Sequence, residues 1–228
     1  MGYDARFHLP SNMMVVGPTS SGKTQWLKKL VQNISIIFST KPECLLLFYK
    51  EWQPSYDDIQ RQMIKNSNKN KAFLKFSSIP NTVEEMKELL DMLPKNTPKI
   101  VIFDDYLDEV GTVLKHFFTV LTHHYNCFTV FICQSLFNSR SELRTLSINS
   151  QYMVLFNNPR DRSGITHLAK QVFPNNVSKL VEAYKIATEE KAYSYLLLDF
   201  HQQQHNRVRL RSNIFPSEWP AKVYTSSI

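Results

Sequence analysis

Apolar runs and amphipathic stretches alternate along the 228 residues of the chain. Continuous apolar runs predict strands over residues 13–17, 45–49, 99–103, 128–133, 151–156 and 195–200. Apolar residues at three- and four-residue spacing predict helices over residues 23–38, 110–121, 165–173 and 177–188. Thr82 and Glu85 form a capping box, which predicts one more helix over residues 83–93. Residues 208–210 are expected to pair with the last of the strands.

This order of elements predicts an α/β fold. Apolar runs that do not alternate with polar residues are typical of a parallel sheet that helices cover on both faces. Right-handed crossovers then give a mostly parallel, doubly wound sheet, which binds ligands beyond the carboxyl ends of its strands. We expect a single domain over residues 1–228, with residues from about 200 to 228 as a basic C-terminal extension. No apolar run reaches the length of a membrane span.

The loop after the first predicted strand matches the phosphate-binding pattern G-x-x-x-x-G-K-[ST], with a strand before it and a helix after it. The matching residues are Gly17, Pro18, Thr19, Ser20, Ser21, Gly22, Lys23 and Thr24. The glycines let consecutive backbone N–H groups face a phosphate, and the helix N-terminus adds positive potential. We expect Lys23 to neutralise the β and γ phosphates of a nucleoside triphosphate and Thr24 to bind Mg²⁺.

Acidic residues follow the third predicted strand, as in a Walker B motif. Asp104 is expected to hold Mg²⁺ with Thr24, and Asp105 to orient or deprotonate the attacking water. Glu109 is a second candidate for the base, although acids here can also be N-terminal residues of the next helix. Gln134 ends the following strand and would reach the γ-phosphate or the water if that strand neighbours the strand of Asp104. The alternative is an ordinary polar residue at a strand end.

The chain is basic, with 27 Lys and Arg against 20 Asp and Glu, a net charge of +7. A basic surface suits a polyanionic partner, although charge alone does not identify one. Cys44, Cys127 and Cys133 lie in apolar runs and lack the spacing of a zinc site or a disulfide framework. We therefore expect buried free thiols and an intracellular, reducing compartment.

These motifs together resemble the FtsK–HerA superfamily of P-loop ATPases, which includes DNA translocases and viral packaging ATPases. The resemblance rests on the phosphate-binding loop, the strand ending in Asp104-Asp105 and the strand ending in Gln134-Ser135. Later segments are similar to the packaging ATPases of Polintons, adintoviruses, virophages and, more distantly, poxviruses. These segments are residues 147–149, 152–161, 170–174, 195–199 and 207–211, and the resemblance as a whole runs from about Arg6 to about Pro216.

The resemblance implies a RecA-like P-loop NTPase fold that hydrolyses ATP with Mg²⁺ and translocates double-stranded DNA during genome packaging. It implies a homo-oligomeric ring, pentameric or hexameric, with an arginine finger from the neighbouring subunit. Candidate fingers are Arg144, Arg160, Arg162 and Arg140, each of which can equally face solvent or DNA. Proteins of the capsid vertex would be further partners, and no membrane insertion is expected. The site of action would be the assembling virion in the host nucleus or cytoplasm.

Two basic segments are candidates for gripping DNA phosphates without reading sequence. One is residues 65–71, expected to be a loop rich in Lys and Asn. The other contains Arg207, Arg209 and Arg211, whose alternation would place all three on one face of a strand as a basic stripe. Either segment can also be a solvated surface.

Aromatic residues follow the second predicted strand in residues 51–56, which we expect to form a loop. Trp52 and Tyr56 can stack on a nucleotide, pack a subunit interface or, as is more usual, cap the core.

Other functions remain open at this point. A nucleotide or small-molecule kinase also uses a P-loop, but the sequence shows no acceptor-binding constellation. An AAA+ or superfamily 3 helicase would need an origin-binding region, and a nucleotide-bound switch would hydrolyse slowly. Stimulation of ATP hydrolysis by double-stranded DNA would separate a DNA motor from the kinase.

Overall fold

The structure is a computed structural model that describes residues 4–66, 73–93, 96–106, 110–136, 141–202 and 204–225. Within these residues, strands form one sheet in the order β3-β2-β4-β5-β1-β6-β7-β8-β9. The strands are β1 Ser11–Val16, β2 Cys44–Tyr49, β3 Phe73–Phe76, β4 Lys99–Asp104, β5 Cys127–Cys133, β6 Tyr152–Phe156, β7 Tyr195–Asp199, β8 Leu210–Ser212 and β9 Lys222–Val223. The pairs from β3 to β6 are parallel, and β7, β8 and β9 continue the sheet antiparallel. The predicted mostly parallel α/β sheet is confirmed.

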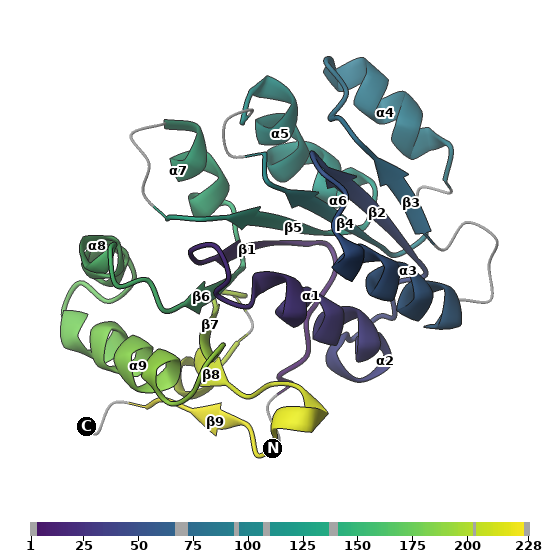
Figure 1. Cartoon of the computed structure of the whole chain (residues 1–228). Helices are drawn as coiled ribbons and strands as arrows, with labels where there is room; N and C mark the ends of the chain where they lie inside the picture. The colour runs from purple at the N-terminus through teal and green to yellow at the C-terminus, as the bar shows by residue number, and fades with distance from the viewer. Residues whose placement is uncertain are drawn as a thin grey trace.

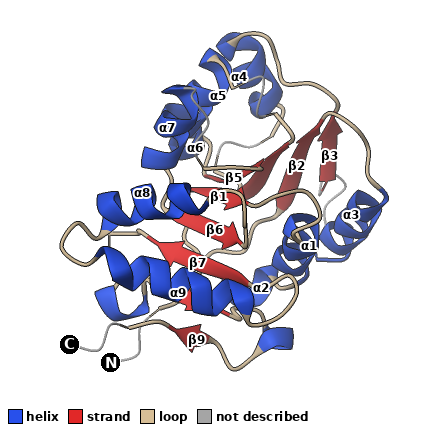
Figure 2. Ribbon diagram, turned by 60° about the vertical axis from the view of Figure 1, so that its left-hand side comes forward, coloured by secondary structure: helices blue, strands red, loops and turns tan. Residues whose placement is uncertain are grey.

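Helices cover both faces of this sheet (Figures 1 and 2). They are α1 Lys23–Gln32, α2 Ile34–Ile37, α3 Pro54–Asn66, α4 Val83–Asp91, α5 Thr112–His116, α6 Thr122–His124, α7 Ser141–Ile148, α8 Arg162–Val172 and α9 Val177–Glu189. A π-helical turn, Phe117–Leu121, joins α5 to α6, and 3₁₀ turns cover Asn206–Val208 and Pro216–Glu218. The α4–α9 side and the α1–α3 side therefore each bury one face of the sheet.

Two apolar cores follow from the alternation of side chains along the strands. Met14 and Val16 of β1 point into the core shared with α4–α9, whereas Met13 and Val15 point into the core shared with α1–α3. The other central strands divide their residues in the same way. Burial on both faces explains why these strands read as continuous apolar runs in the sequence.

The predicted buried thiols are confirmed: Cys44, Cys127 and Cys133 are free and buried. Burial raises the pKa of the Cys127 thiol and of the Cys133 thiol to about 12. Cys127 and Cys133 are therefore protonated core residues at neutral pH.

The helix predicted over residues 23–38 was wrong in its length. Asn33 ends α1, because its side-chain amide and its backbone N–H both donate to the carbonyl oxygen of Lys29, at 2.8 and 3.1 Å. Asparagine competes with the helix for backbone partners in this way. The chain then continues as the short helix α2.

The loop predicted over residues 51–56 was also partly wrong. Pro54 begins α3, a position where its missing N–H costs the helix nothing. The strand β3 and the helix α7 were not predicted from the sequence. Residues 206–208 form a 3₁₀ turn, so the strand that pairs with β7 is Leu210–Ser212 and not residues 208–210.

Two other predicted features are present. The Glu85 N–H donates to Thr82 Oγ1 at 3.1 Å, and the Glu85 carboxylate accepts from the Asn81 N–H at 2.9 Å. The helix predicted over residues 110–121 begins at Thr112 and runs through the π-helical turn.

Candidate active site

The predicted phosphate-binding loop joins the buried strand β1 to the first turn of α1. Gly22 precedes α1 with a φ of 105°, and Ser20 has a φ of 63°, so both have left-handed backbone. Lys23 Nζ donates hydrogen bonds of 2.6 Å to the carbonyl oxygen of Gly17 and 2.8 Å to that of Pro18. The loop is therefore folded around the ammonium group of its own lysine.

Space as well as conformation requires glycine at both ends of this loop. A Cβ at position 17 would lie 2.6 Å from Ser21 Oγ and 2.7 Å from Phe156 Cβ. A Cβ at Gly22 would lie 2.9 Å from Tyr193 Cβ, and its backbone would be strained for any side chain. The loop is thus packed against the end of β6 and the turn before β7.

A pocket of about 350 Å³ opens beside the loop at the carboxyl ends of the parallel strands. Its lining residues are Thr19, Ser20, Lys23, Thr24, Gln53, Asp104, Asp105, Ile132, Cys133 and Gln134. The sheet explains this grouping, because β5 pairs with β1 on one side and with β4 on the other. The structure therefore brings Asp104, Asp105 and Gln134 close to Lys23 and Thr24. Gln134 follows β5, which neighbours the strand of Asp104, as its expected role requires.

Asp104 is a buried carboxylate, with 7% of its surface exposed. Burial raises its pKa, and the neighbouring Asp105 charge raises it further, while the Tyr56 hydroxyl and the Lys23 charge lower it. Burial likewise lowers the pKa of Lys23, and Asp104 opposes that shift. The two groups stabilise each other's charged forms.

Asp105 differs from Asp104 in both exposure and backbone. Its side chain is exposed, and its φ is 65°, a conformation that few residues other than glycine adopt. Strained backbone of this kind occurs often at functional sites, where the surrounding structure holds it. The left-handed turn directs the chain away from the sheet immediately after Asp104.

The donors in this pocket suit Mg²⁺, which is bound by oxygen ligands, usually one or two carboxylates together with phosphates and water. Thr24 provides a hydroxyl and Asp104 a carboxylate. Among the described residues, no group of three or more His, Cys, Asp or Glu side chains could hold a metal ion without other ligands. A magnesium ion held by Thr24 and Asp104 would therefore complete its coordination with phosphate oxygens and water.

Two further residues of the site lie in the aromatic segment after β2, where Tyr56 was expected to contact a nucleotide, an interface or the core. Gln53 lines the pocket, and the Tyr56 hydroxyl donates a 2.6 Å hydrogen bond to Asp104 Oδ2. Both follow β2, whose last residue, Tyr49, pairs with Asp104. The available signal was their place after an apolar strand whose carboxyl end lies at the same edge of the sheet. Tyr56 is 1% exposed, so it packs in the core and is not a surface aromatic.

Gln134 is connected to the segment that carries two of the candidate arginines. The neighbouring Ser135 Oγ donates a 2.8 Å hydrogen bond to Asp161 Oδ2. The other oxygen of Asp161 accepts a 3.0 Å hydrogen bond from the Gly164 N–H and so caps α8. The end of β5 and the start of α8 are therefore joined through one carboxylate.

The candidate arginine fingers lie on the surface and outside the pocket. Arg144 is exposed on α7, Arg160 is exposed in the turn after β6, and Arg162 is exposed at the start of α8. None of the three lines the pocket described above. Arg140 and Glu109 lie outside the described residues.

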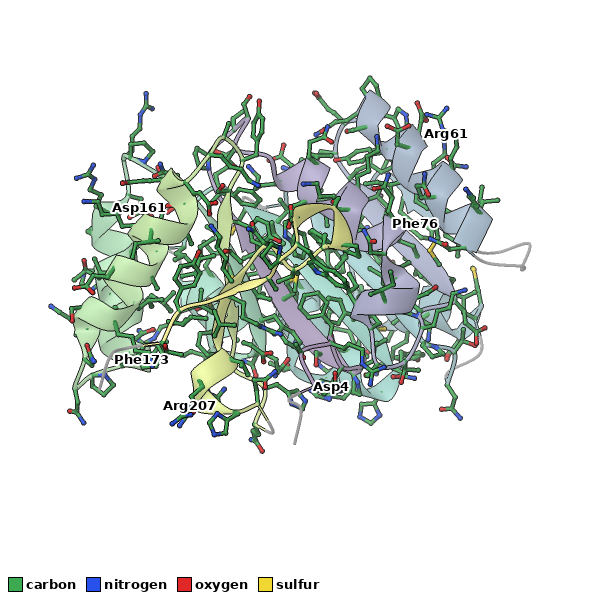
Figure 3. All side chains as sticks on the ribbon, turned by 90° about the horizontal axis from the view of Figure 1, so that it is seen from below. Asp4, Arg61, Phe76, Asp161, Phe173 and Arg207 are labelled. Atoms are coloured by element: carbon green, nitrogen blue, oxygen red, sulfur yellow. The ribbon has the colours of Figure 1, made fainter. Side chains whose placement is uncertain are left out.

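The predicted basic stripe of Arg207, Arg209 and Arg211 was wrong. Arg207 lies in a 3₁₀ turn, and Arg211 is 3% exposed and pairs with the buried Asp199 at 2.6 Å. Arg209 donates to the Asp199 carbonyl oxygen at 2.9 Å. In Figure 3, Arg207 and Asp4 lie along one edge of the molecule, away from Asp161. Alternation places residues on one face only within a strand, and here the strand begins at Leu210.

The other predicted basic segment is described only in part. Lys65 is exposed in the last turn of α3, and residues 67–71 lie outside the described residues. Among the described residues, no helix combines the length and apolarity that crossing a bilayer requires.

No family model and no curated protein matches the sequence of this chain. A solved structure, the genome packaging NTPase B204 of Sulfolobus turreted icosahedral virus 2 in complex with sulfate, is similar to it at a TM-score of 0.52 and 12% identity. The alignment covers 100% of this chain and 99% of that chain. The protein therefore shares the complete fold of that NTPase.

Proposed function

We propose that this protein is an ATP-driven motor that moves double-stranded DNA, as a viral genome-packaging ATPase does. The observation that carries the proposal is the pocket in which Lys23, Thr24, Asp104, Asp105 and Gln134 meet. The name of the structural neighbour, a genome packaging NTPase, supports the packaging role. The resemblance of the motifs to the FtsK–HerA superfamily supports ATP as the nucleotide and DNA as the substrate.

Each residue of the pocket has a role in this proposal. The loop amides and Lys23 bind the phosphates, because a loop before a helix N-terminus is an anion site. Magnesium, held by Thr24 and Asp104, supplies neutralising charge to the phosphate oxygens when bound. Asp105 orients the attacking water or accepts its proton, and Gln134 contacts that water or the γ-phosphate.

The candidate arginines act on the pocket of a neighbouring subunit. Arg144, Arg160 and Arg162 are exposed and therefore free to enter a site across a subunit interface. An arginine supplied in this way stabilises transition-state charge and is worth about 10³–10⁵ in rate. The working assembly is a pentameric or hexameric ring of identical subunits around DNA, acting with capsid vertex proteins at the assembling virion in the host nucleus or cytoplasm.

ATP turnover with and without double-stranded DNA tests the proposal. We expect DNA to stimulate hydrolysis, and we expect DNA affinity to fall steeply with salt because phosphate contacts release counterions. Light scattering with DNA and a non-hydrolysable ATP analogue should detect a ring. Turnover that ignores DNA, together with transfer of phosphate to a small acceptor, would identify a kinase instead. A preference for single-stranded DNA would identify a helicase.

A further inference from the structure

A second hollow, of about 410 Å³, lies on the other side of the phosphate-binding loop from the carboxylates. It is lined by Ser20, Ser21, Asn157, Thr188, Glu189, Lys191, Ala192, Tyr193 and Ser194. Ser20 lines this hollow and the pocket of Asp104, so the two spaces meet at the loop. A ligand whose phosphates occupy the loop could therefore extend into the hollow.

The order of strands gives such a ligand a direction across the sheet. The carboxylates and Gln134 come from β4 and β5, on one side of β1. The hollow is built from the end of β6 and the turn before β7, on the other side of β1. These two elements meet because β7 is antiparallel to β6, which places Tyr195 opposite Phe156. The terminal phosphates and their metal ion belong near β4 and β5, so the remainder of a nucleotide points toward β6 and β7.

Tyr193 contributes an aromatic ring to the lining of the hollow. It lies within a turn closed by a 3.2 Å hydrogen bond from the Ser194 N–H to the Lys191 carbonyl oxygen. Its φ is 63°, although tyrosine is disfavoured in left-handed backbone by about 1–2 kcal/mol. The side chain remains 66% exposed and yet packs beside Gly22 of the loop. The fold thus holds an aromatic ring at the edge of the phosphate site. Because the ring is mostly exposed, packing in the core does not explain its position.

Ser194 adds a polar group to the same hollow. It is 8% exposed, and its hydroxyl has no hydrogen-bond partner among the residues that the structure describes. The same is true of the hydroxyl of Ser21, which lies on the loop itself. Both oxygens are buried, so each would hydrogen-bond to a ligand in the hollow only after its side chain rotates.

We propose that this hollow binds the nucleoside part of the nucleotide, with the ring of Tyr193 stacked on the base. The proposal rests on the proposed function, because it requires the phosphates to occupy the loop. Stacking on an aromatic ring accepts any base, and stacking strength favours purines. The hollow therefore contributes affinity for ATP over CTP, while the loop contributes affinity for the phosphates.

Binding of Mg·ATP and of Mg·tripolyphosphate, both measured by calorimetry, tests the proposal. Tripolyphosphate has the phosphates but no base, so it reports on the loop alone. Tyr193→Gly removes the ring and suits the left-handed backbone, so the turn is kept. We expect this variant to bind ATP about tenfold more weakly, equivalent to about 1.4 kcal/mol, and to bind tripolyphosphate as the wild type does.

Two further variants complete the experiment. Tyr193→Phe keeps the ring and should bind ATP within about twofold of the wild type, because stacking does not need the hydroxyl. Trp219→Ala removes an aromatic ring of similar exposure, 61%, that does not line the hollow, and should change neither affinity. An unchanged ATP affinity in Tyr193→Gly, or an equal loss for tripolyphosphate, would overturn the base site while leaving the phosphate site standing. Binding of neither ligand by the wild type would instead overturn the proposed function.

Discussion

The Tyr56 hydroxyl lies 2.6 Å from Asp104 Oδ2 and donates a hydrogen bond to it inside the core. The two residues come from α3 and β4 and are 48 positions apart in sequence. Since the hydrogen bond lowers the pKa of Asp104 against the effect of burial, it favours the charged carboxylate that a metal ion needs. Tyr56 is therefore a positioning residue for Asp104.

Tyr56→Phe removes this hydrogen bond and leaves the ring in the core. Residues that hydrogen-bond to a metal ligand typically contribute about 10–100-fold to metal affinity or activity, so we expect a rise of this order in the Mg²⁺ concentration for half-maximal ATP hydrolysis. Tyr106→Phe is the matched control, because Tyr106 is also 1% exposed but donates to the Tyr49 carbonyl oxygen at 2.9 Å. Equal Mg²⁺ dependence in the two variants would refute the role of Tyr56.

Ser135→Ala breaks the link between the end of β5 and Asp161 but leaves the Asp161 cap on α8. Gln134, which would contact the γ-phosphate, is next to Ser135, so this link can report the nucleotide state to the segment of Arg160 and Arg162. We then expect ATP affinity to stay unchanged in the variant while DNA stimulation of turnover falls. Substitutions within a coupled network change coupling by about 0.5–2 kcal/mol, which corresponds to about 2- to 30-fold. A titration of turnover against DNA measures this change.

Ser178→Ala is the control for that experiment, because it removes a serine hydrogen bond of 3.0 Å at the N-terminus of the next helix, α9. It should leave DNA stimulation intact. A Ser135→Ala enzyme with full stimulation would show that the Asp161 contact does not carry the nucleotide signal.

The buried pair of Arg211 and Asp199 should matter for stability and not for nucleotide binding. Both residues are at most 3% exposed, and Arg211 also donates to the Ala5 carbonyl oxygen at 2.7 Å. Arg211→Met leaves a buried carboxylate without its cation, which typically costs about 3–5 kcal/mol of unfolding free energy. Urea unfolding measures the loss. The double variant with Asp199→Leu should recover part of it, and a single variant as stable as the wild type would disprove the prediction.

The nucleotide site was predictable where its residues form a contiguous motif or follow an apolar strand. Lys23 and Thr24 belong to one eight-residue pattern. Asp104 is the last residue of β4, and Gln134 directly follows β5. Both strands are buried on both faces and are therefore visible in the sequence as apolar runs. Parallel strands end at one edge, so their convergence followed from the fold class alone.

Residues whose role depends on tertiary packing were not predictable. Tyr56 contacts Asp104 because α3 packs against the central strands, and its sequence position, which marked it as an aromatic residue after a strand, does not reveal this partner. Tyr193 is singled out by its backbone conformation, which no pattern reveals. Arg211 was expected to be a surface charge. Its partner, Asp199, ends the apolar strand β7, and the two residues meet only because β8 pairs with β7. In each case the deciding contact joins different elements of the fold.

Turnover of ATP by the Lys23→Ala variant is the decisive measurement for the phosphate-binding loop as a catalytic site. We expect Mg²⁺-dependent hydrolysis by the wild type and its loss in the variant, with the fold retained by circular dichroism. Lys170→Ala, which removes an exposed lysine on α8, should keep full activity. If Lys23→Ala turned over ATP at the wild-type rate, the phosphate-binding loop would not be the catalytic site, and the motor function proposed for this protein would be contradicted.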